Sequence, residues 1–143
     1  MPQETRDVLL KKIEKIKGLL DDLDQLLSKP FDVYRTDRIP LSAAQRYFEL
    51  MVELASDINT SLILAKSGQT PDSYREAFSR MSNLGLEPSV VALLVEGARE
   101  RNILIHEYDF DIDDEKFYDS AKRVVPAFRK YLKFINTYLE NFK

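Results

Sequence analysis

The 143-residue chain contains no cysteine, which excludes disulfide bonds and metal sites built from thiolates. No run of apolar residues approaches the roughly 20 that a membrane-spanning helix needs, so we expect no membrane partner. The first residues, Met1 to Asp7, do not have the pattern of a secretory signal peptide. Together these absences predict a cytoplasmic location.

Signals for β-strands are also nearly missing, because no alternating run is bounded by turns and no Asn-Gly hairpin occurs. The sequence has no internal repeat and no glycine-rich phosphate loop, and we expect no cofactor. Apolar residues recur instead at steps of three and four, as on the buried face of a helix. The first such stripe, which Pro30 ends, comprises Leu9, Ile13, Ile16, Leu20, Leu23 and Leu27.

Start signals and apolar stripes predict four further helices. One begins at Ser42, which forms a capping box with Gln45 after a connection over residues 31–40, and it stops at Gly68. The others are predicted to begin at Thr70-Pro71, at Pro88, and at Asp113 or Asp114. A chain of this length forms one domain, residues 1–143. The predicted fold class is therefore all-α, an up-and-down bundle of four to five helices.

The net charge of −3 argues against binding long nucleic acid through bulk electrostatics, although it leaves room for a local basic site. Basic residues of the last predicted helix form either such a face or an exposed surface with compensating charges. They are Lys122, Arg123, Arg129, Lys130 and Lys133.

The most informative segment runs from Arg101 to Tyr108 and contains the only histidine, His106. A histidine titrates near neutral pH and a nearby arginine supplies a fixed positive charge, and phosphoryl transfer on RNA needs both. On one continuous helix, Arg101 and Tyr108 lie about 20° apart, whereas His106 lies about 140° from Arg101. The arginine and the histidine therefore converge only if the helix breaks near His106 or if a second protomer supplies the missing group.

A two-fold homodimer with this segment at its axis would place two histidines in one cleft. Cleavage of RNA without metal needs one group that accepts the 2′-hydroxyl proton and another that protonates the leaving oxygen. One histidine per chain cannot easily do both, whereas two per dimer could.

The same region also permits simpler interpretations. A histidine or an arginine near the C-terminal end of a helix is favourable because its positive charge meets the helix dipole. The acidic run from Asp109 to Glu115 begins like a calcium loop, but Asp114 occupies the glycine position and Ser120 that of the final glutamate. We therefore interpret this run as a solvated connection whose last carboxylates cap the final helix, with no metal bound.

The segment Arg101-Asn102-x3-His106-Glu107-Tyr108 does not stand alone. Residues 71–78 read Pro-Asp-Ser-Tyr-Arg-Glu-Ala-Phe, and residues 55–59 read Ala-Ser-Asp-Ile-Asn. In order and spacing, these three blocks resemble the HepT-type toxins, the DUF86 branch of the HEPN superfamily. The blocks are, respectively, similar to the family's Arg-x4-His-x-Tyr motif, its Pro-x-Ser-Tyr-Arg-Glu-Ala-Phe segment and the end of its second helix.

The resemblance implies a metal-independent ribonuclease that acts as the toxin of a two-gene toxin–antitoxin system. Its implied partners are RNA and an MNT-type nucleotidyltransferase antitoxin that transfers AMP to the motif tyrosine, besides the second copy of the chain that the helix geometry suggests. By this resemblance, Arg101 would neutralise the scissile phosphate, Asn102 would help to orient it, and His106 would be the acid/base. Tyr108 would accept AMP, which adds bulk and negative charge beside the arginine. Asp57 is a further candidate for the wall of the site.

The chain departs from the family pattern in two places. Arg99-Glu100 stand where Gly-Phe is common, and Asn59 to Ser61 stand where many members carry a histidine. Two other functions also remain open at this point. One is a non-catalytic module that binds nucleotide beside a minimal nucleotidyltransferase, and the other is a helical scaffold whose motif only packs a dimer interface.

Overall fold

The computed structural model describes residues 1–107 and 112–142, and every regular element in these ranges is helical. The predicted all-α class is therefore confirmed for the described residues. The elements are α1 (Gln3–Leu26), α2 (Phe31–Tyr34), α3 (Arg38–Ser67), α4 (Tyr74–Ser79), the 3-10 helix η1 (Arg80–Leu84), α5 (Pro88–His106) and α6 (Asp114–Asn141).

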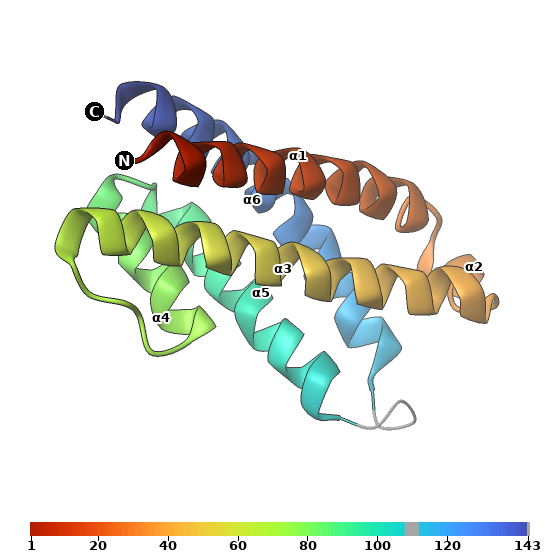
Figure 1. The fold of residues 1–143 in the computed structure, drawn as a ribbon. Coiled ribbons are helices and arrows are strands. Elements are labelled where there is room, and N and C mark those ends of the chain that lie inside the picture. Colours follow the sequence, from red (N-terminus) through yellow and green to blue (C-terminus); the bar gives the residue numbers. More distant parts are fainter. Residues whose placement is uncertain (108–111, 143) are drawn as a thin grey trace.

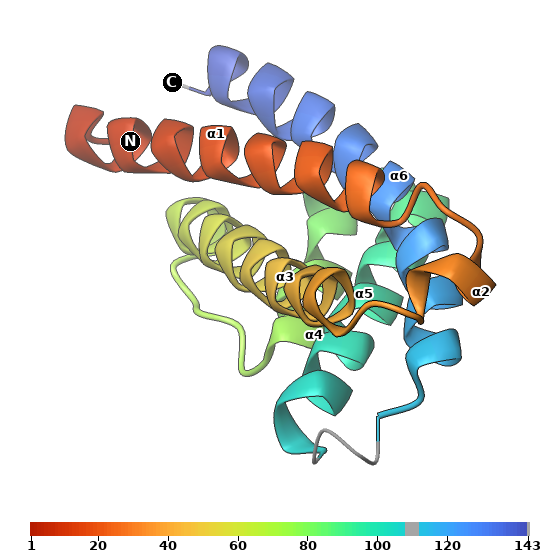
Figure 2. The same cartoon turned by 90° about the vertical axis from the view of Figure 1, so that its right-hand side faces the viewer.

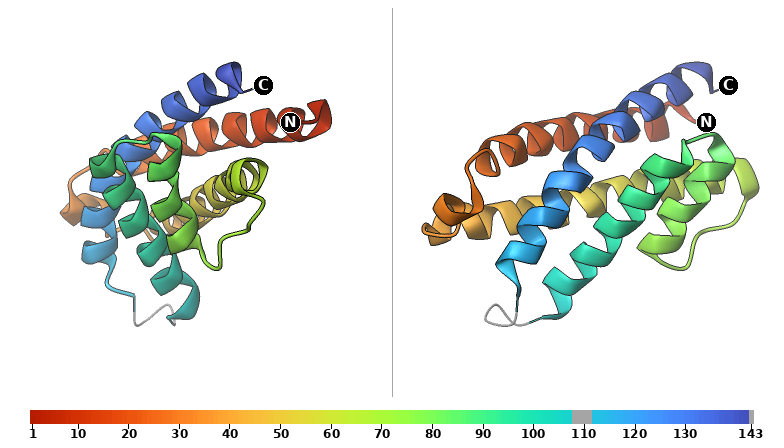
Figure 3. Two further views of the ribbon diagram at one scale, coloured as in Figure 1. Left: turned by 90° about the vertical axis from the view of Figure 1, so that its left-hand side faces the viewer. Right: turned by 180° about the vertical axis from the view of Figure 1, so that it is seen from behind.

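Four long helices make the body of the molecule (Figure 1). Helices α1 and α3 run side by side, while α5 and α6 cross them as a second pair that is seen from behind in Figure 3. The two termini lie close together, and Arg6 Nη1 donates a hydrogen bond of 2.7 Å to the carbonyl of Leu139. The C-terminal end of α5 lies at one edge of the molecule, beyond α3 in both Figure 1 and Figure 2.

The predicted apolar stripes form the core. All six residues of the first stripe are buried, five of them in α1 and Leu27 directly after its end. Aromatic rings from three other helices meet edge to face, Phe48 with Phe117 and Phe78 with Phe128, at centroid distances of 5.3 and 6.0 Å. The apolar spacing also predicts Ala65 on the buried face of α3, but this residue is exposed near the end of that helix.

A glycine sets how closely α5 approaches α6. A Cβ atom added to Gly97 would lie 3.0 Å from Val124 Cγ1 and 3.4 Å from Phe128 Cε2. Because both partners are fully buried, the absence of a side chain at Gly97 permits this contact.

Two predicted helix starts are wrong. Helix α3 begins before Ser42, because the Asp37 side chain accepts a hydrogen bond from the Ile39 amide and caps the helix there. Pro40 falls in the first turn, where its missing N–H is not needed, and the expected connection over residues 31–40 contains α2. Helix α4 begins after Ser73, which accepts from the Glu76 amide, rather than after Thr70.

Other predicted boundaries are confirmed. Gly68 ends α3 with φ at 74°, Pro88 opens α5, and Asp113 caps α6 by accepting from the Lys116 amide. The last case also confirms that a carboxylate of the acidic run caps the final helix. Within the described residues, no helix is both long and apolar enough to cross a bilayer.

Candidate functional site

Helix α5 carries Arg101 and His106 without interruption. The chain leaves the helix at Glu107, whose ψ is 149° and whose amide still donates to the Ile103 carbonyl at 2.9 Å. His106 is the last helical residue, so the helix ends too late to turn its side chain toward Arg101. The angular separation of about 140° between the two therefore persists within one chain.

Arg101 is held from three sides. Its Nη2 lies 3.2 Å from Glu53 Oε1 of α3, and its Nη1 donates to Asn102 Oδ1 at 3.2 Å. The third contact is the Tyr74 ring at the start of α4, whose centroid lies 4.4 Å from the guanidinium carbon. The side chain is 17% exposed, and its buried Nε has no hydrogen-bond partner among the described residues.

The three sequence blocks converge only in part at this arginine. Tyr74 belongs to the second block and contacts Arg101 directly. Asp57, from the first block, is exposed and lies 3.4 Å from Lys12 Nζ of α1 instead. Asn102 Oδ1 accepts a hydrogen bond from Arg101, and its expected role in orienting the phosphate stays a prediction.

His106 and Tyr108 differ in what the structure describes. His106 is exposed at the end of α5, where its ring is accessible and where a positive charge is favourable. Tyr108, the expected AMP acceptor, lies outside the described residues, as do Asp109 and Asp111.

Sequence analysis did not identify Glu53 or the role of Tyr74. Glu53 lies one helical turn before Asp57, so it shares the same side of α3, but nothing in its local sequence indicates a partner on α5. Tyr74 belongs to the second sequence block, but only the structure shows that its ring stacks on the arginine.

Asn59 does not line the site. It is fully buried, and the Tyr131 hydroxyl of α6 lies 2.5 Å from its Oδ1 and 3.1 Å from the Ala55 carbonyl. Burial also raises the pKa of Tyr131 well above its usual value. Asn59 therefore joins α3 to α6, in the stretch where many members of the family that the sequence resembles carry a histidine.

Two carboxylates of α5 face α6 near the motif. Burial raises the pKa of Glu100, which is 6% exposed. Burial also favours a higher pKa for Glu96. Hydrogen bonds from Ser120 at 2.7 Å and Arg123 at 2.9 Å outweigh this effect, so the pKa of Glu96 is lowered. The departure from Gly-Phe before the motif thus places a carboxyl group, Glu100, in the α5–α6 contact.

Three of the five basic residues that could form an RNA-binding face on α6 have internal partners. Arg123 pairs with Glu96, Arg129 pairs with Asp21 and Asp24 of α1, and Lys122 donates to the Leu27 carbonyl. These contacts favour the surface with compensating charges over a basic RNA-binding face on this helix.

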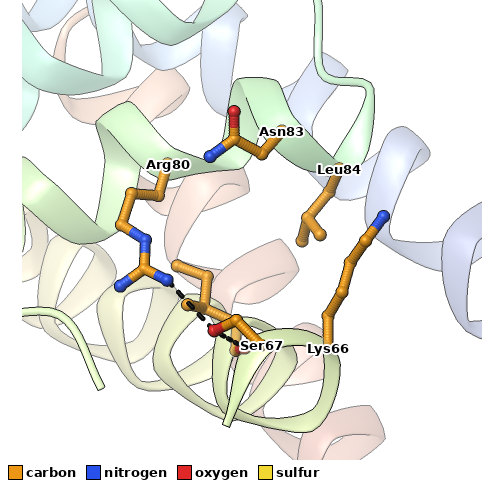
Figure 4. Close-up of a pocket in the computed structure, with 6 residues that line it drawn as sticks. Lys66, Ser67, Arg80, Asn83 and Leu84 are labelled. Atoms are coloured by element: carbon orange, nitrogen blue, oxygen red, sulfur yellow. Dashed lines mark hydrogen bonds between the residues drawn. The ribbon is translucent and has the colours of Figure 1, made fainter. Parts of the chain in front are cut away.

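A small pocket of about 110 Å³ lies at the C-terminal end of α3 (Figure 4). It is lined by Ile63, Lys66, Ser67, Arg80, Asn83 and Leu84, and Arg80 Nη2 donates to Ser67 Oγ at 3.0 Å. The positive charges there meet the carbonyl end of α3, which explains them without a ligand. No motif residue lines this pocket, and within the described residues no cluster of His, Asp or Glu could hold a metal ion.

Solved structures of toxins in complex with their antitoxins share this fold. The chain is 17% identical to a tri-AMPylated Shewanella oneidensis HEPN toxin solved in complex with an MNT antitoxin, with a TM-score of 0.80 over 96% of this chain and 99% of that chain. A toxin–antitoxin structure with AMP-PNP gives 18% identity and a TM-score of 0.79 over 92% and 98% of the two chains. The structure of a mutant MntA–HpeT toxin–antitoxin pair gives 16% identity and a TM-score of 0.77, again over 92% of this chain and 98% of that chain.

A family model described as ribonuclease HepT-like matches residues 9–135, and the chain therefore belongs to the HepT-like ribonuclease family. This confirms the family expected from the three sequence blocks. A comparison with curated proteins found no match.

Proposed function

We propose that the protein is a metal-independent endoribonuclease and the toxin of a toxin–antitoxin pair, with Arg101 and His106 as its catalytic residues. Arg101 neutralises the scissile phosphate, and Asn102 fixes the arginine through the bond between Nη1 and Oδ1. His106 transfers protons to and from the reacting oxygens. Membership of the HepT-like ribonuclease family supports the reaction type.

The observation that carries the proposal is that one helix bears both a held arginine and an accessible histidine. The Arg101 side chain is 17% exposed and contacts three side chains, whereas His106 is exposed at the end of the same helix. A positioned cation and a free acid/base group are what phosphodiester cleavage requires.

The active species in this proposal is a homodimer. Because helix α5 is continuous through His106, one chain does not bring its own histidine beside its arginine. A two-fold axis at the exposed end of α5 would bring two such ends together and supply two histidines to one cleft.

The proposed antitoxin is an MNT-type nucleotidyltransferase that silences the enzyme by AMPylation of Tyr108. The structural neighbours support this partner, since one is a tri-AMPylated toxin solved with an MNT antitoxin. A phosphate attached near Arg101 would occupy the charge that RNA needs. In this scheme Asp57 is a wall residue, one turn from Glu53.

The test combines growth with cleavage. Expression of the wild type alone should arrest growth and co-expression of the antitoxin should relieve it, while purified protein should cleave RNA in EDTA. Arg101→Ala should abolish both effects, and Arg99→Ala, which removes an exposed arginine two residues earlier, should leave both intact. Normal growth together with no cleavage would instead favour a nucleotide-binding module.

A further inference from the structure

We infer that Glu53 and Tyr74 position Arg101 for RNA, and that the Glu53 carboxylate holds in the free protein the place that a phosphodiester takes when it binds. This inference rests on the proposed function. It adds two residues to the site and states how the substrate enters it.

The pairing of Arg101 with Glu53 is incomplete. Glu53 Oε1 lies 3.2 Å from Nη2, while the adjacent Nε is buried and has no partner among the described residues. A guanidinium group normally pairs with an oxyanion through two parallel N–H donors. Among the described residues, only Nη2 of the Nε–Nη2 edge has an acceptor, and Nε has none.

A phosphodiester would complete this edge. Its two non-bridging oxygens match the two donors of a guanidinium edge, and a bond to Nε would satisfy the donor that Glu53 leaves unpaired. A carboxylate and a phosphate carry charges of the same sign, so they do not share one edge. The phosphodiester therefore displaces Glu53.

The exposures of the two side chains decide which one moves. Glu53 is 30% exposed on the surface of α3 and can turn toward water, whereas Arg101 is 17% exposed. Arg101 is also held by Asn102 and by the Tyr74 ring, neither of which depends on Glu53. The carboxylate leaves, and the guanidinium stays.

Tyr74 supplies the fixed surface for this exchange. It is the first residue of α4, and the Ser73 side chain caps that helix at the Glu76 amide. The capped start therefore fixes the ring whose face lies against the guanidinium, and the ring fixes the plane of the guanidinium. This contact gives a physical role to the Ser-Tyr pair of the second sequence block.

The first experiment measures the arginine itself. We would follow modification of Arg101 by an arginine-selective dicarbonyl reagent, using peptide mass spectrometry on folded protein. Glu53→Gln and Tyr74→Leu should accelerate the modification several-fold, and Tyr74→Phe, which keeps the ring, should not. The control is Glu49→Gln, one turn earlier on α3, where Glu49 pairs with Arg46 at 3.0 Å. Unchanged reactivity in both Glu53→Gln and Tyr74→Leu would overturn the positioning role.

The second experiment measures RNA. In a His106→Ala background, which prevents turnover, Glu53→Gln should tighten binding of a short RNA by about three- to tenfold, because a competing like charge is gone. Tyr74→Leu should weaken binding, and Glu49→Gln should have little effect. With His106 present, Glu53→Gln should lower KM, because the carboxylate no longer competes with RNA, and should leave kcat nearly unchanged, because the carboxylate has already left Arg101 in the bound complex. Unchanged or weaker RNA binding in Glu53→Gln would overturn the displacement.

The two experiments separate this inference from the proposed function. If Arg101 reactivity responds as expected but the wild type neither binds nor cleaves RNA, the positioning role stands and the ribonuclease proposal fails. If RNA is cleaved and Arg101 reactivity does not respond, the ribonuclease proposal stands and the positioning role fails.

Discussion

Arg101 and His106 lie on one uninterrupted helix, with the arginine turned inward onto Glu53 and the histidine exposed at the last helical position. This relationship constrains catalysis, because the two groups of one chain diverge by about 140°. The mechanism that we propose uses both groups and therefore draws on two chains.

A mixed dimer tests the use of two histidines. We expect a dimer with one wild-type chain and one His106→Ala chain, purified through two different affinity tags, to cleave RNA at far less than half the wild-type rate. The reason is that the proton acceptor and the proton donor would come from different chains. The mixed dimer of wild type with Arg99→Ala is the control. Half of the wild-type activity in the first dimer would show that each chain acts independently.

The two carboxylates between α5 and α6 should respond to pH in opposite ways. The pKa of Glu100 is raised, mainly by burial, so its stabilising contribution exists below the ordinary glutamate pKa of about 4.3 and is lost as pH rises. Glu100→Gln should therefore melt a few degrees above the wild type at pH 7, and the difference should shrink near pH 4.

Glu96 is the matched comparison on the same helix. Its pKa is lowered because the Ser120 and Arg123 bonds outweigh burial, so its contribution exists above about pH 4.3 and is lost as pH falls. Glu96→Gln should melt below the wild type at pH 7 and approach it in acid. Thermal melts at several pH values measure both variants, and shifts of equal sign at pH 7 would contradict this account.

Two glycines on different helices should respond oppositely to alanine. At Gly97 the added Cβ would lie 3.0 Å from Val124 Cγ1, and we expect Gly97→Ala to destabilise the protein by about 1–3 kcal/mol. At Gly18, exposed within α1, nothing lies within 4 Å, and Gly18→Ala should stabilise by up to about 1 kcal/mol through helix propensity. Denaturant unfolding measures both, and a stabilised Gly97→Ala variant would show that the α5–α6 contact is looser than described.

Removal of the buried Tyr131 hydroxyl should lower stability without changing catalysis. Tyr131→Phe removes its contacts with Asn59 and the Ala55 carbonyl and should cost about 1–3 kcal/mol of unfolding free energy. Cleavage by the folded variant should be unaffected, because Asn59 is fully buried and bonds to Tyr131 rather than to Arg101. A loss of kcat without a loss of stability would place Asn59 in the site after all.

The sequence predicts the buried faces of the helices well, because apolar spacing depends only on helix geometry. The start of α3 was predicted too late, since Pro40 resembles a helix breaker, although in the first turn its missing N–H is not needed. For the same reason, the sequence pattern does not single out Asp37 as the cap.

The candidate site was predicted to the extent that it lies in one segment. Arg101, Asn102 and His106 fall within six residues and could be identified from their spacing. Glu53 could not, because it lies 48 residues from Arg101 and meets it only when α3 packs beside α5. Asp57 illustrates the same limit, since its partner is Lys12 of α1.

The most direct test of the central claim is the identity of the ends left on cleaved RNA. We would incubate purified wild type and His106→Ala with a defined RNA in EDTA and determine the product termini by mass spectrometry. Attack by the 2′-hydroxyl predicts a 2′,3′-cyclic phosphate and a 5′-hydroxyl from the wild type, and no product from His106→Ala. Ends with a 5′-phosphate, or equal cleavage by a folded His106→Ala protein, would contradict the account.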